Sequence, residues 1–198
     1  MTPFVLLAGA RQRGTSMIEV LVTLVIIAIG LLGLAGLQLR LESSEMEAYQ
    51  RSQALILLDD MVNRMDTNRF SAALYPVASP LTAPVGAGMT CPAPGAGATR
   101  VEQDVRDWCD ALQGAAEAVS GSRVGAMIGG RGCVEDLGLG ASGSQHYRVT
   151  VAWQGLTPTT APAETCGQNL YNGSAGAACR DDLCRRTVST VVHMANLR

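Results

Sequence analysis

Six cysteines and two histidines are the residues of this chain best suited to cross-linking or metal binding. The cysteines all follow residue 90, at Cys91, Cys109, Cys133, Cys166, Cys179 and Cys184. Zinc is disfavoured, because the chain has no C-x-x-C pair and its histidines do not stand at a ligand spacing. An even number of cysteines in one part of a chain is typical of an exported, oxidised domain. We therefore expect disulfides. The connectivity stays open, and our guess joins Cys166 to Cys179 or Cys184.

The rest of the chain offers little for catalysis. The sequence contains no G-x-S-x-G, H-E-x-x-H, phosphate-loop or dinucleotide-binding motif. Asp181 and Asp182 lack the spacing of a calcium loop, so we expect them in a solvated turn. All 15 basic residues are arginines, scattered along a chain of net charge -2, which argues against nucleic-acid binding and lysine chemistry. We expect no enzyme, no metal, no cofactor and no nucleic-acid partner.

One carboxylate, Glu19, stands at the start of a long apolar run. Residues 20–37 carry no formal charge and would span roughly 27 Å as a helix, close to the thickness of the hydrocarbon core of a bilayer. Arg11 and Arg13 precede this run and no comparable basic cluster follows it, so the N-terminus should be cytoplasmic and the cysteine-bearing part outside. An acidic residue within a membrane is costly and normally has a partner or a function.

The order of these features, R-Q-R-G, then T-S-M-I-E, then an apolar helix, resembles the class III leader of type IV prepilins and pseudopilins. The resemblance implies that a prepilin peptidase cuts after Gly14 and methylates the new amino terminus at Thr15. Glu19 then becomes the fifth mature residue, where the family keeps a glutamate. In a filament of packed helices, its carboxylate can pair with the amino terminus of a neighbouring subunit, so that two buried charges neutralise each other.

More narrowly, S-M-I-E-V-L-V-T-L-V-I-I-A-I-G-L-L-G-L-A-G-L-Q-L is similar to the PilV group of minor pilins, the type IV pilus modification proteins. This resemblance implies a subunit that acts in initiation of pilus assembly or in a tip complex. Its partners would be prepilin peptidase, other minor pilins, the major pilin and a pilus-tip adhesin. The subunit would lie in the inner membrane before assembly, with its C-terminal part periplasmic, and then in the pilus. Two alternatives remain: an I-type minor pseudopilin of type II secretion, and a membrane-anchored periplasmic binding domain or enzyme.

The apolar helix should continue beyond the membrane. A stripe of apolar residues recurs every seven positions, with two further members three residues later: Leu41, Ala48, Leu55 and Val62, then Leu58 and Met65. The helix should stop near residues 66–68. Residues 68–99 then form a linker rich in proline and glycine.

The C-terminal part should mix helix and strand. Thr99 and Glu102 form a capping box ahead of an amphipathic helix whose Trp108 is expected in the core. Strands are expected at 146–153, at 187–194 and at 126–135, with His146 and His193 on the surface or hydrogen-bonded. In the first of these strands, one face should be buried: Tyr147, Val149, Val151 and Trp153.

Together these features predict an α+β, pilin-like fold. A long N-terminal helix should pack against a small antiparallel sheet whose loops are pinned by disulfides. The expected parts are a leader at 1–14, a helical spine at 15–67 with its membrane segment at about 17–38, the linker at 68–99 and a globular domain at 100–198.

Overall fold

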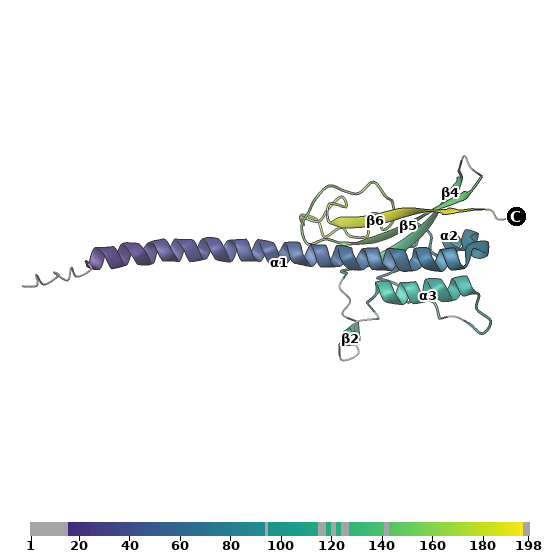
Figure 1. Ribbon diagram of the computed structural model, residues 1–198, viewed down its shortest axis with the longest axis horizontal. Coiled ribbons are helices and arrows are strands. Elements are labelled where there is room, and N and C mark those ends of the chain that lie inside the picture. Colours follow the sequence, from purple (N-terminus) through teal and green to yellow (C-terminus); the bar gives the residue numbers. More distant parts are fainter. Residues whose placement is uncertain are drawn as a thin grey trace, which may run out of the picture. The chain divides into compact units, whose positions relative to one another are not determined.

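The computed structural model describes residues 16–93, 95–114, 118–119, 122–123, 127–140 and 143–195. The chain forms two compact units, which meet between Ser43 and Ser44. Helix α1, Met17–Thr67, contains 51 residues and runs through this boundary (Figure 1). The expected division of the chain at residues 14, 67 and 99 into leader, helical spine, linker and globular domain stays a prediction.

The second half of α1 packs against the globular unit through one stripe. Its buried residues recur at helical spacing: Gln50, Ala54, Leu58, Met61 and Met65. The helix ends at Thr67, as predicted. The predicted seven-residue stripe is wrong in its first part, because Leu41, Ala48 and Leu55 are exposed. A straight helix drifts away from a strict seven-residue repeat, and residues 54–58 read Ala-Leu-Ile-Leu-Leu, so periodicity could not choose the buried face.

The segment after α1 contributes to the core, although the sequence suggested a linker there. It forms a 3-10 helix, η1, Arg69–Leu74, a single helical turn, α2, Tyr75–Ala78, and a short strand, β1, Val85–Gly86. Tyr75, Val85 and Cys91 are buried in the main hydrophobic cluster. Pro76 stands in the first turn of α2, where a missing N–H breaks no helical hydrogen bond.

Helix α3, Arg100–Leu112, begins with the predicted capping box. The Glu102 N–H donates to Thr99 Oγ1 at 3.3 Å, and the Thr99 N–H donates to Glu102 Oε2 at 2.7 Å. The contact with the Thr99 backbone lowers the pKa of Glu102. Trp108 is fully buried, as predicted, and its indole N–H donates to the carbonyl oxygen of Leu57 on α1 at 2.8 Å.

The main sheet is antiparallel, with strand order β1-β4-β5-β6. Its long strands are β4, Arg131–Leu139, β5, Gln145–Gln154, and β6, Arg185–Met194. A second, two-stranded sheet joins β2, Ala118–Val119, to β3, Ser122–Arg123. Figure 1 shows the main sheet on one side of the second half of α1 and α3 on another. This arrangement confirms the predicted α+β, pilin-like fold.

The strand predictions hold with two corrections. Strand β4 begins at Arg131 rather than at residue 126, because residues 128–129 form a turn in which Gly129 has a positive φ. The predicted inward face of β5 is buried, but Thr150 and Ala152 on its other face are buried too. The long segment between β5 and β6 covers that other face, and its Cys166 and Tyr171 cluster with Ala152.

Three disulfides join the six cysteines: Cys91–Cys109, Cys133–Cys166 and Cys179–Cys184. The guess that Cys166 bonds to Cys179 or Cys184 is wrong. Cys166 instead bonds to Cys133 on β4, because the segment after β5 folds back over the sheet. This bond closes a loop of 33 residues, which limits the freedom of the unfolded chain.

Two ion pairs hold the long segment between β5 and β6. Asp182 is buried, not solvated as expected, and pairs with the buried Arg185 at 3.3 Å. At the same end of β5, one carboxylate oxygen of Glu47 on α1 accepts from the backbone N–H groups of Leu156 and Thr157, from the Thr157 hydroxyl and from Arg186. Glu47 therefore ties α1 to both ends of this segment.

Candidate functional site

The candidate site begins at the first turn of α1. The Glu19 N–H donates to Ser16 O at 3.0 Å and to Ser16 Oγ at 3.3 Å, so Ser16 satisfies an otherwise unpaired amide of the helix start. Glu19 therefore lies where the helix dipole is positive and favours an acidic side chain. Gly14 and Thr15, the predicted cleavage and methylation residues, lie outside the described residues.

The Glu19 side chain is exposed, and no hydrogen bond or ion pair joins its carboxylate to another described residue. In water the exposed Glu19 carboxylate is hydrated and needs no partner from the protein. In a hydrocarbon environment an unpaired carboxylate is strongly unfavourable, so a membrane-embedded Glu19 would need a positive group from outside this chain.

The first half of α1 exposes its apolar side chains on every side. Val20 is 48% exposed and Leu32 is 73% exposed, and no residue of the most apolar stretch is buried. A side chain added at Gly30, Gly33 or Gly36 would meet no atom of the chain within 4 Å. Among the described residues, α1 is the one helix long and apolar enough to cross a membrane. This surface is suited to lipid or to the helices of other subunits.

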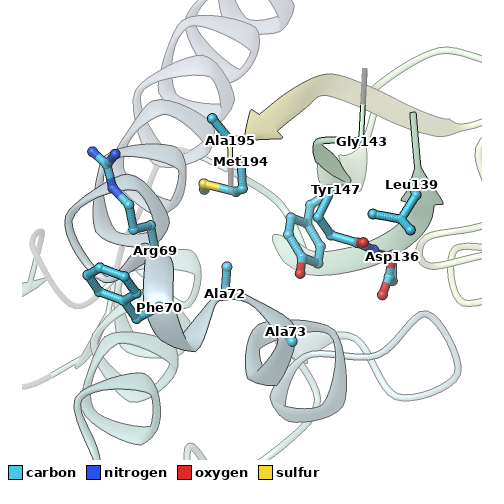
Figure 2. Close-up of a pocket in the computed structure, with 11 residues that line it drawn as sticks. Arg69, Phe70, Ala72, Ala73, Asp136, Leu139, Gly143, Tyr147, Met194 and Ala195 are labelled. Carbon is cyan, nitrogen blue, oxygen red and sulfur yellow. Dashed lines mark hydrogen bonds between the residues drawn. The ribbon is translucent and has the colours of Figure 1, made fainter. Parts of the chain in front are cut away.

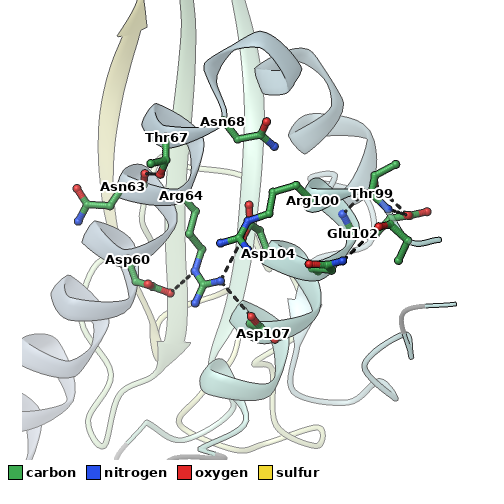
Figure 3. A network of polar contacts seen from close by, with 12 residues as sticks. Asp60, Asn63, Arg64, Thr67, Asn68, Thr99, Arg100, Glu102, Asp104 and Asp107 are labelled. Atoms are coloured by element: carbon green, nitrogen blue, oxygen red, sulfur yellow. Dashed lines mark hydrogen bonds and ion pairs between the residues drawn. The ribbon is translucent and has the colours of Figure 1, made fainter. Parts of the chain in front are cut away.

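A polar network joins the C-terminal part of α1 to α2 and α3 (Figure 3). At its centre, the buried Asp104 accepts from the Tyr75 hydroxyl at 2.7 Å, from Arg100 at 3.1 Å and from Arg64 at 3.3 Å. Arg64 also contacts Asp60 at 2.9 Å and Asp107 at 3.2 Å. This network packs helices together and leaves its central carboxylate fully engaged.

The surroundings of Tyr75 and Arg64 in this network favour the protonated form of both side chains. Burial, followed by the contact with Asp104, raises the pKa of Tyr75 to about 12, so its hydroxyl stays a donor at neutral pH. Burial alone would lower the pKa of Arg64, but the surrounding carboxylates outweigh it and raise that pKa. Because Tyr75 and Arg64 keep their protons at neutral pH, they are suited to a structural role rather than to proton transfer.

A pocket of about 520 Å³ lies at the far end of the sheet, beside η1 (Figure 2). Figure 2 shows Met194 and Ala195 between η1, which carries Phe70, and Tyr147 on β5. The walls are mixed apolar and polar, and Phe70 is 95% exposed. Nothing in the sequence pointed to this pocket, because its walls come from four separate segments.

The two histidines face each other across β5 and β6. The rings of His146 and His193 are 4.1 Å apart and nearly perpendicular, and the His146 Nε2 lies 3.0 Å from the Ser144 hydroxyl. The part of the chain that the structure describes contains no group of three His, Cys, Asp or Glu side chains that could hold a metal ion. The histidines thus have local partners on the sheet surface.

Comparison with known families gives one match. Residues 9–35 match the model of the Prokaryotic N-terminal methylation motif, a span that includes Gly14, Thr15 and Glu19. No curated protein and no solved structure matches the chain.

The motif, the exposed apolar helix and the small disulfide-bonded sheet together support a type IV pilin-like protein. They favour a structural, membrane-anchored subunit over an enzyme. A prepilin-type motif implies processing by prepilin peptidase and assembly with other pilins.

Proposed function

We propose that this protein is a minor pilin of a type IV pilus, of the PilV type, that acts in initiation of pilus assembly or in the tip complex. The observation that carries the proposal is the methylation motif over residues 9–35, placed directly before an apolar helix with Glu19 in its first turn. The apolar surface of the first half of that helix has no partner among the described residues, as expected of a subunit that assembles.

Processing would set the position of Glu19. Prepilin peptidase cuts the chain after Gly14 and methylates the amino group of Thr15. The mature chain then starts one residue before the Ser16 cap, and Glu19 becomes its fifth residue. The methylated amine of one subunit and the Glu19 carboxylate of its neighbour can neutralise each other within the fibre core.

The membrane segment, residues 17–38, would have its amino end in the cytoplasm, because Arg11 and Arg13 precede it. The remainder of the chain would lie in the periplasm. Its three disulfides support this side, because disulfides persist in the oxidising periplasm and are rare in the cytoplasm. Before assembly the protein is an inner-membrane protein, and afterwards a fibre subunit. Its partners would be other minor pilins, the major pilin and a pilus-tip adhesin.

Mass spectrometry of the mature N-terminus tests the proposal. We expect a chain that starts at Thr15 with one added methyl group. An intact leader, or an unmethylated chain cut elsewhere, would overturn it and favour a plain membrane anchor. Deletion of the gene then distinguishes a type IV pilus from a type II secretion system. We expect loss of pili, whereas loss of type II secretion with normal pili would point to a minor pseudopilin.

A further inference from the structure

The two edges of the main sheet differ. One edge is β1, which contains only two residues and contacts α3. The Gln113 side-chain amide donates to Gly86 O at 2.7 Å, and the Val134 N–H on β4 donates to Ser79 O at 2.9 Å, so this edge is already partly occupied. The other edge is β6, with ten residues in unbroken register with β5. No described strand pairs with the outer side of β6.

The register fixes which groups of β6 point outward. The Gly155 N–H donates to Cys184 O at 2.7 Å, which makes these two opposed residues a hydrogen-bonded pair. Because such pairs alternate along an antiparallel ladder, the even-numbered residues of β6 bond to β5. The odd-numbered Arg185 is consistent with this alternation, because its N–H points away from β5 and donates to Asp182 O at 3.0 Å.

The odd-numbered residues of β6 therefore present their N–H and C=O groups to the free edge: Thr187, Ser189, Val191 and His193. None of these groups makes a backbone hydrogen bond outside the β5–β6 ladder within the described part of the chain. Glu164 accepts from the hydroxyls of Thr187 and Ser189, so the segment before β6 lies near the first half of the strand. The second half, from Ser189 to His193, is the open part.

Edge strands usually carry devices that prevent pairing with another chain, such as lysine, proline, inward charges or bulges. Strand β6 contains no proline, lysine, aspartate or glutamate, and its pairing has no irregularity. The side chains of its two arginines are used within the chain, by Asp182 and Glu47. Val191 is 41% exposed at the middle of the open part. The edge is thus suited to strand addition.

We propose that the free edge of β6, from Ser189 to His193, binds an extended strand of a different subunit of the same fibre. This inference rests on the proposed function, because it takes its partner from the assembly that a pilin joins. The main-chain groups of the three odd-numbered residues supply the hydrogen bonds. The side chains of the partner strand supply the specificity.

The direction of β6 argues against a second copy of this chain as the partner. Glu47 of α1 pairs with Arg186 at the start of β6, whereas Phe70, just after α1, lines the pocket with Met194 at the end of β6. Two copies paired antiparallel through β6 would have their Ser44 residues at opposite ends of a strand about 33 Å long. Subunits whose α1 helices lie parallel, as the pairing of Glu19 with a neighbouring amino terminus requires, could not pair in this way.

The pocket beside η1 defines the chemistry of the partner strand. It begins at Met194, directly after the open part of β6, and its other walls include Tyr147 and the exposed Phe70 and Leu139. A strand added along β6 would end beside this pocket. We therefore expect a strand with one large apolar or aromatic residue at that end, which packs against Phe70 and Leu139.

Val191→Pro in the full-length protein, expressed in its native cells, tests the proposal. Proline removes only an outward-facing N–H, which an edge strand tolerates, whereas Val191→Thr keeps it and serves as the matched control. We expect Val191→Pro to reduce the protein in sheared fibres about tenfold, with normal levels in the membrane, while Val191→Thr behaves like the wild type. Equal incorporation of the proline variant would overturn the proposal.

Amide hydrogen exchange on the detergent-solubilised full chain provides a second, folding-independent test. We expect fast exchange at Ser189, Val191 and His193, and protection at Val188, Thr190 and Val192. Protection of all six amides would mean that the edge is already covered. Val191→Cys tests whether a second copy of this chain binds the edge instead. Disulfide-linked homodimers of this variant in cells would show that it does, and would overturn the proposal that the partner is a different subunit.

The failures of the two proposals are distinguishable. If the N-terminus of the wild type is not methylated Thr15, the proposed function fails. If the wild type is methylated and reaches the fibre, but Val191→Pro reaches it equally well, only the strand addition fails.

Discussion

The two halves of α1 share one helical geometry and differ in what surrounds them. Between Met17 and Ser43 the apolar side chains are exposed all round, whereas between Ser44 and Thr67 they are divided into a buried stripe and a solvated remainder. A helix that is apolar on every side needs a surrounding that is apolar on every side. The first half is therefore suited to lipid or to the helices of other subunits, whereas the second half packs against its own chain.

Glu19→Gln, in the first half of α1, should have the largest effect. We expect a loss of fibre incorporation of roughly a hundredfold or more, because the amino terminus of a neighbour would stay buried without its partner. Cleavage, methylation and the globular fold should be retained. Immunoblots of sheared fibres and membranes measure the effect, with Glu42→Gln on the same helix as the control. Normal assembly of Glu19→Gln would refute the pairing.

Trp108→Ala tests the dependence of the second half on α3. We expect a loss of about 3–5 kcal/mol in the free energy of unfolding, because a large buried side chain and its bond to Leu57 O are removed. Urea unfolding of the full chain in detergent, with disulfides intact, gives this value. Phe70→Ala is the matched aromatic control, since Phe70 is 95% exposed and should change little. Similar losses for both variants would contradict the structure.

A direct comparison of the halves uses Met61→Ala and Ile26→Ala. Met61 is fully buried, so its truncation should lower the free energy of unfolding of the globular unit by about 2–5 kcal/mol. Ile26 is 63% exposed, and its truncation should leave that value within about 0.5 kcal/mol. A large effect of Ile26→Ala on unfolding would mean that the two units are coupled in stability.

Thr99→Ala should have a smaller effect. Loss of the cap leaves the Glu102 N–H in the first turn of α3 without its acceptor and should destabilise the globular unit by about 1 kcal/mol. Thr99→Ser retains the hydroxyl and should therefore retain nearly all of the stability that the alanine variant loses. If the alanine variant matches the wild type in urea unfolding, the capping box makes no contribution to stability.

Tyr75→Phe removes the hydrogen bond to Asp104, so it should lower stability at neutral pH and make stability less sensitive to alkaline pH. The folded-state pKa of Tyr75 is about 12, above the ordinary value of 10, so its stabilising contribution is complete below pH 10 and is lost as the pH rises through about 12. The wild type should therefore lose stability over that range more steeply than Tyr75→Phe. Thermal unfolding followed at stepped pH values shows the difference. Identical slopes would indicate that the phenol ionises freely.

Local patterns in the sequence predicted the local structure well. The Thr99–Glu102 capping box, the end of α1 at Thr67 and the inward face of β5 all follow from side chains within a few residues of each other. Such features depend on hydrogen bonds and periodicities that a short segment carries by itself. The six cysteines likewise predicted a disulfide-bonded unit from their number and position.

Features that depend on distant segments were not predictable. Cys166 bonds to Cys133 because the segment after β5 folds over the sheet, and no local signal encodes that path. The same fold buries Asp182 beside Arg185. The buried stripe of α1 was also ambiguous, since apolar residues lie on several faces and only the packed sheet and α3 choose among them. The pocket beside η1 is a fourth case, assembled from segments far apart in the chain.

The contacts of Glu47 have a mechanical consequence. Tension carried along α1 would enter the globular unit at Ser44, and Glu47, close to that point, bonds to the start of β6 and to the segment after β5. One of its carboxylate oxygens, Oε1, accepts hydrogen bonds from both ends of the segment that connects β5 to β6. Because α1 and β6 run in the same direction, a pull on α1 would load these bonds and the long β5–β6 ladder in shear, with many hydrogen bonds sharing the force, rather than unzipping them one at a time.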